Sequence, residues 1–362
     1  MRLQVIEADK PSADQAGPIA VQPSRPTVLV LGGTGFLGRA LVKRLLQDGI
    51  GLRALVRDLS GRAELLARQG VELVKGDIAD TASVEAALDG IQHVYHLARG
   101  SGPAWDDYLR FDVEPTRRLA ELCSARGIGI YYTSSIAIYD GGRARDSITE
   151  STPPSRASMR LNVYARAKVA NERLLADMHR GRGLNVVVFR PGIVIGVGGN
   201  PRHQGVGAWP DPSTCRPWGG GGHPLPFLLV DDCADAMVRA LHVPDIAGES
   251  FNLVGDASLS GKGYLDALER IAGSKIKRLP LPAWRLFAQS VAKWGIKLLS
   301  GAPEHPMPSY RYCDGLSCRA SYVADMAKRR LAWVPVSDPT VMIDRGIAVA
   351  VAESRRGDLA PT

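Results

Sequence analysis

Short apolar runs along the chain alternate with longer stretches in which apolar residues recur at helical spacing. After the first run, for example, Phe36, Leu37, Leu41 and Leu45 fall on one helical face. The apolar runs predict buried strands, and a chain of 362 residues is long enough for one large α/β domain with a smaller second lobe. The predicted strands are residues 27–31, 52–58, 71–74, 91–98, 128–132, 185–190 and 248–254.

The first predicted strand runs into a glycine-rich turn, residues 31–38, and then into the first predicted helix. Gly32 permits a tight turn, Gly35 lets the backbone approach a pyrophosphate, and Gly38 lets the helix pack closely on the strand. The unpaired N–H groups and the dipole at the helix start favour the negative charge of a dinucleotide. The spacing Gly-x-x-Gly-x-x-Gly is one residue longer in its first gap than the commoner fingerprint, so the motif alone could be no more than a turn.

Composition narrows the class of protein. The hydrophobic fraction of 45%, the charged fraction of 23% and the net charge of +8 fit a globular protein with a basic, solvated surface. The basic residues are spread through helical segments and no nucleic-acid-binding module is visible, so we expect no nucleic-acid partner. The five scattered cysteines form no C-x-x-C pair, so we expect no metal site, no disulfide framework and a reducing, cytoplasmic location.

Two further stretches bear on membranes and processing. Residues 1–26 carry charges and prolines without the apolar core of a signal peptide, and we expect a flexible lead-in there. No apolar run approaches the length of a membrane-spanning helix, so we expect no integral membrane segment. Residues 286–299 are amphipathic, with Lys293 and Lys297 among apolar residues. They could line a lipid-sized pocket or make a peripheral membrane contact, with ordinary packing as the alternative.

Three residues carry the predicted chemistry. Ser135 follows the predicted strand 128–132 at the carboxyl edge of the sheet, where open α/β sheets bind ligands. Tyr164 and Lys168 are four apart, hence on one face of a helix predicted over roughly 162–180. A free tyrosine has a pKa of about 10, and a nearby ammonium lowers it toward the working range of a proton donor and acceptor. The Ser135 hydroxyl would hydrogen-bond the substrate oxygen and stabilise charge that develops there.

In this order, the glycine turn, the Ser-Ser strand end and the Tyr-x-x-x-Lys helix resemble the extended short-chain dehydrogenase/reductase superfamily, which includes the NAD-dependent epimerase/dehydratase family. Further matching segments extend the resemblance over residues 27–345. It implies hydride transfer using a bound nicotinamide, whose positive charge would add to that of Lys168. It also implies a doubly wound parallel Rossmann sheet with a smaller C-terminal substrate lobe. The implied divisions are a Rossmann domain at 27–190, a substrate lobe at 191–345 in which about 227–254 returns to the Rossmann domain, and a tail at 346–362.

The resemblance also assigns the cofactor-binding residues. Arg57 ends the second strand like the 2′-phosphate arginine of the dihydroflavonol reductase and 3β-hydroxysteroid dehydrogenase-like branch, which favours NADP(H), whereas Asp58 keeps NAD(H) open. Asp77 would accept from the adenine amine, or cap the next helix in competition with Asp80 or Thr81. The full expected set is Gly32, Thr34, Gly35, Phe36, Leu37, Gly38, Arg57, Asp77, Ile78, Leu97, Ala98, Arg99, Thr133, Tyr164, Lys168, Pro191 and Val194.

Two of the departures from the family pattern bear on the expected site. Arg99 stands where family members usually place a small residue. It could bind an anionic substrate or the cofactor phosphates, or point to solvent. Asp112 replaces an asparagine that helps to hold a water near the active-site lysine in the family; an aspartate could do so with altered charge.

The substrate lobe leaves several functions open. Residues 197–226 are rich in glycine and proline and long for a loop, which predicts an active-site cover. Asp231 and Asp232 resemble a helix entry common among sugar enzymes, although their carboxylates would at least cap the helix. The favoured function is an NAD(P)-dependent oxidoreductase acting on a secondary alcohol or ketone of a bulky small molecule, steroid-, flavonoid- or lipid-like. The alternatives are a nucleotide-sugar epimerase or dehydratase that retains NAD, and a non-catalytic dinucleotide-binding subunit. A homodimer is expected by analogy alone.

Overall fold

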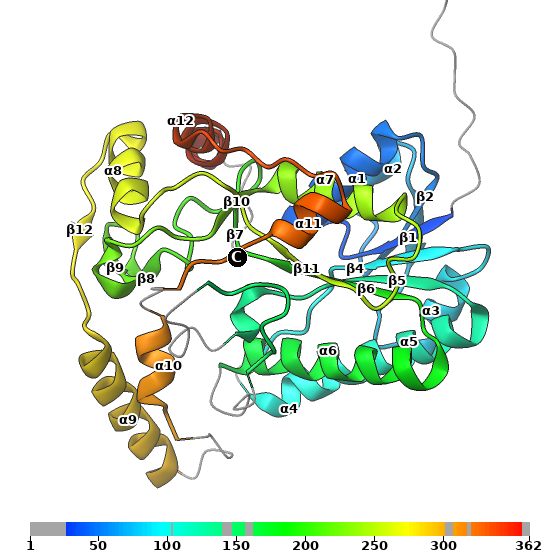
Figure 1. The fold of residues 1–362 in the computed structure, drawn as a ribbon, viewed down its shortest axis with the longest axis horizontal. Coiled ribbons are helices and arrows are strands. Elements are labelled where there is room, and N and C mark those ends of the chain that lie inside the picture. The colour runs from blue at the N-terminus through cyan, green and yellow to red at the C-terminus, as the bar shows by residue number, and fades with distance from the viewer. Residues whose placement is uncertain are drawn as a thin grey trace, which may run out of the picture.

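The computed structural model describes residues 27–102, 104–139, 147–155, 162–300, 307–316 and 320–356. The predicted lead-in at 1–26 lies outside the described residues, as does Cys318. Figure 1 shows one large sheet with helices on both faces and a smaller lobe at one end of it.

The large sheet consists of β1 (Val28–Leu31), β2 (Leu52–Val56), β3 (Glu72–Lys75), β4 (His93–His96), β5 (Gly129–Thr133), β6 (Val186–Pro191) and β11 (Ser250–Leu253). Neighbouring strands are parallel, in the order β11-β6-β5-β4-β1-β2-β3. The order reverses between β1 and β4, and such a switch point is where open α/β sheets bind ligands at the carboxyl ends of their strands. The predicted doubly wound Rossmann sheet is therefore confirmed.

Helices cover both faces because side chains on each strand point alternately up and down. On β1, Val28 and Val30 belong to one buried core, whereas Leu29 and Leu31 belong to the other. Burial on both faces explains why these strands read as continuous apolar runs in the sequence. The first core is covered by α1 (Phe36–Gln47), α2 (Arg62–Arg68), α7 (Val230–Leu241) and α11 (Asp325–Arg330), and the second by α3 (Thr81–Ala87), α5 (Glu114–Arg126) and α6 (Val163–Arg182).

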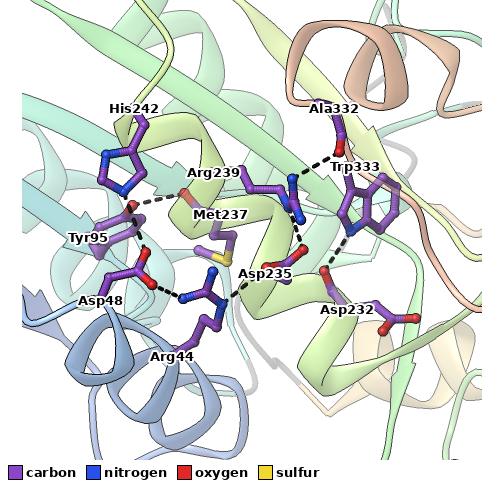
Figure 2. A network of polar contacts seen from close by, with 10 residues as sticks. All are labelled: Arg44, Asp48, Tyr95, Asp232, Asp235, Met237, Arg239, His242, Ala332 and Trp333. Carbon is purple, nitrogen blue, oxygen red and sulfur yellow. Dashed lines mark hydrogen bonds and ion pairs between the residues drawn. The ribbon is translucent and has the colours of Figure 1, made fainter.

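Polar contacts tie α1 and α7 to a segment near the end of the chain (Figure 2). The Arg44 guanidinium of α1 donates to the Asp235 carboxylate of α7, with an Nε–Oδ1 distance of 3.1 Å. The Trp333 indole N–H donates to the Asp232 carbonyl at 2.9 Å, and the Trp333 side chain is buried. The C-terminal segment is therefore fixed against the same face of the sheet as the first helix.

Asp231 and Asp232 do not cap the helix that they begin, so that prediction is wrong. Leu229 occupies the N-cap of α7, and no side chain caps this end. The Asp232 carboxylate instead accepts from the Val336 backbone N–H at 2.8 Å, and Asp231 pairs with Arg345 at 3.2 Å. The partners lie more than a hundred residues away along the chain, so local sequence could not reveal them.

The smaller lobe has its own core beside the end of the large sheet. Residues 197–226, predicted as a loop, contain the antiparallel hairpin of β8 (Gly207–Asp211) and β9 (Thr214–Pro217), so that prediction is wrong for these two segments. β12 (Lys277–Arg278) adds to β9. The other elements of the lobe are β7 (Ile193–Ile195), β10 (Phe227–Leu229), α8 (Gly261–Ala272), α12 (Pro339–Ile343) and α13 (Val349–Arg356), together with the short helical segments η4 (Trp218–Gly221) and η5 (Asp344–Ala348).

Two helices extend from this lobe, α9 (Ala283–Leu299) and α10 (Tyr310–Gly315), and α9 lies at the edge of the molecule in Figure 1. The rings of Phe287 and Tyr310 meet edge to face at 5.7 Å. The predicted amphipathic run 286–299 is thus helical, yet no residue of α9 is buried. Among the described residues, no helix is long and apolar enough to cross a bilayer.

Candidate active site

A strand end and a helix start position two of the predicted catalytic residues. After β5, Ser135 adopts extended backbone and begins the short helix η2 (Ile136–Ile138), with its Oγ accepting from the Ala137 N–H at 3.2 Å. Tyr164 lies in the first turn of α6. That turn is fixed by Asn162, whose Oδ1 accepts from the Ala165 N–H at 2.8 Å.

The structure brings the three predicted catalytic side chains together. The Ser135 side chain lies close enough to the Tyr164 phenol to oppose the effect of burial on the pKa of Tyr164. The Lys168 Nζ lies 6.0 Å from the centre of the Tyr164 ring. A phenol, a hydroxyl and an ammonium therefore meet at the carboxyl edge of the sheet, as proton exchange with a bound carbonyl or alcohol requires.

Lys168 is held in one position by groups of β5. Its ammonium donates to the Tyr132 hydroxyl at 3.1 Å and to the Thr133 carbonyl at 2.9 Å, and the residue is 3% exposed. The Thr133 hydroxyl is buried and has no hydrogen-bond partner among the described residues. Thr133 is a predicted cofactor residue, and its hydroxyl is therefore able to hydrogen-bond a ligand.

Two residues absent from the predicted site, Tyr132 and Asn171, complete this network. Asn171 Nδ2 donates to the Tyr132 hydroxyl at 3.0 Å and to Asp112 Oδ1 at 2.7 Å. The other Asp112 oxygen accepts from the Gly100 N–H at 3.1 Å. Asp112 is thus a buried anion that connects to the lysine through two intermediate side chains. The sequence feature that could have identified Asn171 is its position three residues after Lys168, which places both side chains on one helical face.

Burial shifts the pKa of both titratable groups, Tyr164 and Lys168, in the protein alone. Burial raises the pKa of Tyr164, opposed by the hydrogen bond from Ser135 and the positive charge of Arg99. Burial lowers the pKa of Lys168, opposed by the negative charge of Asp112. Without a bound nicotinamide, desolvation of the phenolate outweighs these favourable contacts, so the predicted lowering of the Tyr164 pKa stays a prediction for the complex with the cofactor.

Arg99 lies beside the phenol of Tyr164. It follows β4, its side chain is exposed, and its guanidinium carbon is 5.8 Å from the centre of the Tyr164 ring. The Arg99 side chain is therefore both exposed to solvent and close to the Tyr164 phenol. From this position, a cation can bind an anionic group on a molecule whose oxygen contacts Tyr164.

The glycine turn has the shape that a dinucleotide needs. Gly32 has φ +86°, and a Cβ there would come within 2.9 Å of the Ala98 nitrogen. A Cβ on Gly38 would lie 2.1 Å from the Gly32 carbonyl oxygen. Gly35 is the N-cap of α1 and offers no side chain, so no cap hydrogen bond occupies the N–H groups of the first turn. These residues fit a pyrophosphate at the helix start.

The other predicted cofactor residues are distributed along the same sheet edge. The Leu97 N–H donates to the Leu31 carbonyl at 2.9 Å, which holds the end of β4 against the glycine turn. Asp77 Oδ1 accepts from the Ala79 N–H at 2.9 Å, and Asp80 is the residue that caps α3. Thr34, Phe36, Leu37 and Ile78 are partly exposed around the turn and after β3, Pro191 ends β6, and Val194 lies in β7.

The two residues that bear on cofactor choice follow the end of β2 and differ in their contacts. Arg57 follows β2 directly and is exposed. The Asp58 carboxylate accepts from the Ser60 N–H at 3.0 Å and from its hydroxyl at 2.9 Å, and these bonds lower the pKa of Asp58. Asp58, the residue that left NAD(H) possible, is therefore hydrogen-bonded within its own turn.

Known proteins resemble the chain across most of its length. The family model "NAD dependent epimerase/dehydratase family" matches residues 28–253. A 2-alkyl-3-oxoalkanoate reductase of Stenotrophomonas maltophilia is 25% identical, with 90% of this chain and 99% of the relative covered. A D-erythronate dehydrogenase of Cupriavidus necator is 30% identical, with 69% and 83% covered. The crystal structure of a UDP-glucuronic acid 4-epimerase from Bacillus cereus, with UDP-glucuronic acid and NAD, superposes with a TM-score of 0.68 at 20% identity, covering 90% of this chain and 99% of that one.

Proposed function

The chain belongs to the NAD dependent epimerase/dehydratase family, and we propose that it transfers a hydride between NADP(H) and a secondary alcohol or ketone of a bulky, lipid-like substrate. Family membership makes the chain an NAD(P)-dependent oxidoreductase or epimerase. The observation that carries the finer proposal is the position of the Tyr164 ring, 6.0 Å from the ammonium of Lys168, which two hydrogen bonds anchor to β5.

Each residue of the trio has a separate part in the reaction. The nicotinamide, when bound, supplies or accepts the hydride. In the reductive direction, Tyr164 donates its hydroxyl proton to the carbonyl oxygen while the Ser135 hydroxyl hydrogen-bonds that oxygen. The carbonyl carbon gains the hydride and its oxygen gains the proton, which gives the alcohol. Lys168 stabilises the phenolate that remains, and oxidation follows the same contacts in reverse.

Arg57 supports NADP(H) over NAD(H). An arginine at the end of the second strand suits a 2′-phosphate, whereas NAD needs a carboxylate there for the ribose hydroxyls. Asp58 is hydrogen-bonded to Ser60 instead. The same arginine supports placing the chain in the dihydroflavonol reductase and 3β-hydroxysteroid dehydrogenase-like branch of the family.

A lipid-like ketone with a carboxylate agrees best with the surroundings of the trio. The 2-alkyl-3-oxoalkanoate reductase acts, by its name, on a ketone that bears alkyl chains and a carboxylate. Arg99, beside Tyr164, suits such a carboxylate. The apolar α9–α10 pair approaches the same helix, because Asn162 Nδ2 donates to the Tyr312 hydroxyl of α10 at 2.7 Å.

The nucleotide-sugar alternative loses its main support from the sequence. It depended on Asp231 and Asp232, and both carboxylates hold the C-terminal segment. A non-catalytic subunit is disfavoured because Tyr164 and Lys168 are both present and lie close together.

We retain a cytoplasmic location and a homodimer as parts of this proposal. A reducing compartment is supported by four cysteines that are buried and form no disulfide among the described residues, namely Cys123, Cys215, Cys233 and Cys313. The homodimer has only the family analogy behind it.

The test is to purify the protein and assay it with a 2-alkyl-3-oxoalkanoate and, separately, with UDP-glucuronic acid. We expect no retained NAD, and turnover of the ketone with NADPH in preference to NADH. Arg57→Asp should weaken NADPH binding about 10- to 100-fold, the worth of a hydrogen bond to a charged group, and should not weaken NADH binding, because the new carboxylate suits the ribose hydroxyls. Arg68→Asp, on the neighbouring helix α2, is the matched control. Tightly held NAD with epimerisation of the sugar nucleotide would replace this proposal by the alternative.

A further inference from the structure

The α9 helix presents large apolar side chains to solvent. Its exposed fractions include 58% for Trp284, 68% for Ile296, 64% for Leu298 and 90% for Leu299. A helix with this composition normally buries a face against the rest of the protein. Not one residue of α9 is buried within the described part of the chain.

The neighbour α10 covers α9 only in part. The half-buried positions Leu286, Phe287, Ser290, Val291 and Trp294 follow helical spacing and define its inner face. Phe287 contacts Tyr310 of α10 edge to face. The two helices support each other, whereas Trp284, Ile296 and Leu299 of α9 are exposed.

Positive charge accompanies these apolar side chains. From Gly273 to Pro303 the sequence contains no aspartate or glutamate. The basic residues of this stretch are Lys275, Lys277, Arg278, Arg285, Lys293 and Lys297. Arg278 pairs with Asp266 and Glu269 of α8. Arg285, Lys293 and Lys297 lie on α9 and give this helix a positive formal charge.

We propose that α9 docks on an anionic lipid surface, with Trp284, Ile296 and Leu299 inserted among the acyl chains and the basic side chains on the headgroups. Tryptophan and leucine on a helix with an excess of lysine and arginine are what an interfacial helix requires. A second copy of this chain is a poorer occupant, because pairing α9 with itself would bring like charges together.

The position of α9 relates this surface to the catalytic helix. Its partner α10 accepts the hydrogen bond of Asn162, two residues before Tyr164, through the Tyr312 hydroxyl. Docking would therefore place the membrane surface near the start of the catalytic helix. The inference itself does not depend on the proposed reaction, since it rests on exposure and charge alone.

The experiment is vesicle flotation of the full chain with phosphatidylcholine vesicles that contain or lack phosphatidylglycerol. We expect binding only to the anionic vesicles, weakened by salt. Lys293→Gln should weaken it about fivefold, the effect of one basic side chain near an anionic surface. Ile296→Ser combined with Leu299→Ser should weaken it at least about tenfold through lost apolar burial.

Matched controls separate this surface from general attraction of a basic protein. Lys43→Gln removes an exposed cation from α1 and should leave vesicle binding unchanged. Thermal unfolding of each variant checks that it is folded. The proposal is overturned if the protein binds neither vesicle, or if the α9 variants bind like the wild type. It is equally overturned if Lys43→Gln weakens binding as much as Lys293→Gln, or if the variants instead dissolve a dimer of this chain.

Discussion

The helices α6 and α9 are both long, amphipathic and rich in basic residues, yet the protein uses them in opposite ways. Of the twenty residues of α6, eight are buried, including Lys168, Asn171 and Glu172. None of the seventeen residues of α9 is buried. A buried polar group needs partners in fixed positions, so α6 is constrained in register and rotation. A helix with no buried residue has no such constraint, and its exposed apolar side chains are available to another surface.

Removing a buried charge from α6 should have the largest effect on stability. Glu172 and Arg190 form an ion pair at 2.7 Å, with side chains 6% and 7% exposed. Glu172→Ala leaves the guanidinium of Arg190 buried without its partner and should lower the free energy of unfolding by about 3–5 kcal/mol. Lys293→Ala, the counterpart on α9, should change it by less than about 0.5 kcal/mol. Urea unfolding measures both, and equal effects would remove the distinction between the two helices.

Acid should destabilise the region around α6 through a buried histidine. Burial lowers the pKa of His96 to about 3, with a contribution from the charge of Lys168. An unfolded histidine has a pKa of about 6.5, so between pH 6.5 and 3 the unfolded chain binds more protons and stability falls as pH falls.

The slope due to His96 alone should be about 1.4 kcal/mol per pH unit. His96→Gln keeps a hydrogen-bonding side chain for Thr116, which lies 3.0 Å from the histidine, and removes the titration. Urea unfolding at a series of pH values should therefore give a flatter dependence for the variant. The same slope in both proteins would show that His96 is not held neutral.

Asp112 should act on the reaction through Lys168. Its negative charge opposes the lowering of the Lys168 pKa by burial. Asp112→Asn preserves the shape of the network and removes that charge, so the Lys168 pKa should fall further. We expect kcat to fall about tenfold, the equivalent of one pKa unit, with the alkaline limb of the pH–rate profile moved to lower pH. A loss of activity with an unmoved profile would indicate a purely structural role.

Arg99 should have the smallest effect, because it is exposed. Arg99→Ala should raise KM for a substrate that bears a carboxylate about tenfold, the worth of a modest hydrogen bond to a charged group. KM for a neutral ketone and for NADPH should stay the same. If instead KM for NADPH rises, the guanidinium binds the cofactor phosphates rather than the substrate. Arg110→Ala, on the exposed side of η1 (Leu109–Val113), is the matched control.

Residues that act through local pattern could be predicted from the sequence, and those that act through long-range contact could not. The glycine turn and the strands were readable because close backbone approach and burial on both faces restrict residue type at each position. Tyr132 was missed because its hydroxyl meets Lys168 from a strand 36 residues earlier in the chain. The hairpin of β8 and β9 was missed because its glycines and prolines are also typical of loops.

The most direct test of the central claim is single-turnover reduction by the wild type and by Tyr164→Phe, with NADPH affinity measured on the same samples. Tyr164→Phe removes one hydroxyl from the trio and leaves the ring in place. We expect the rate to fall about 10²- to 10⁴-fold, the usual contribution of a positioned proton donor, while the Kd for NADPH changes little. A rate within a few-fold of the wild type would contradict the account, because the substrate oxygen would then receive its proton from another group.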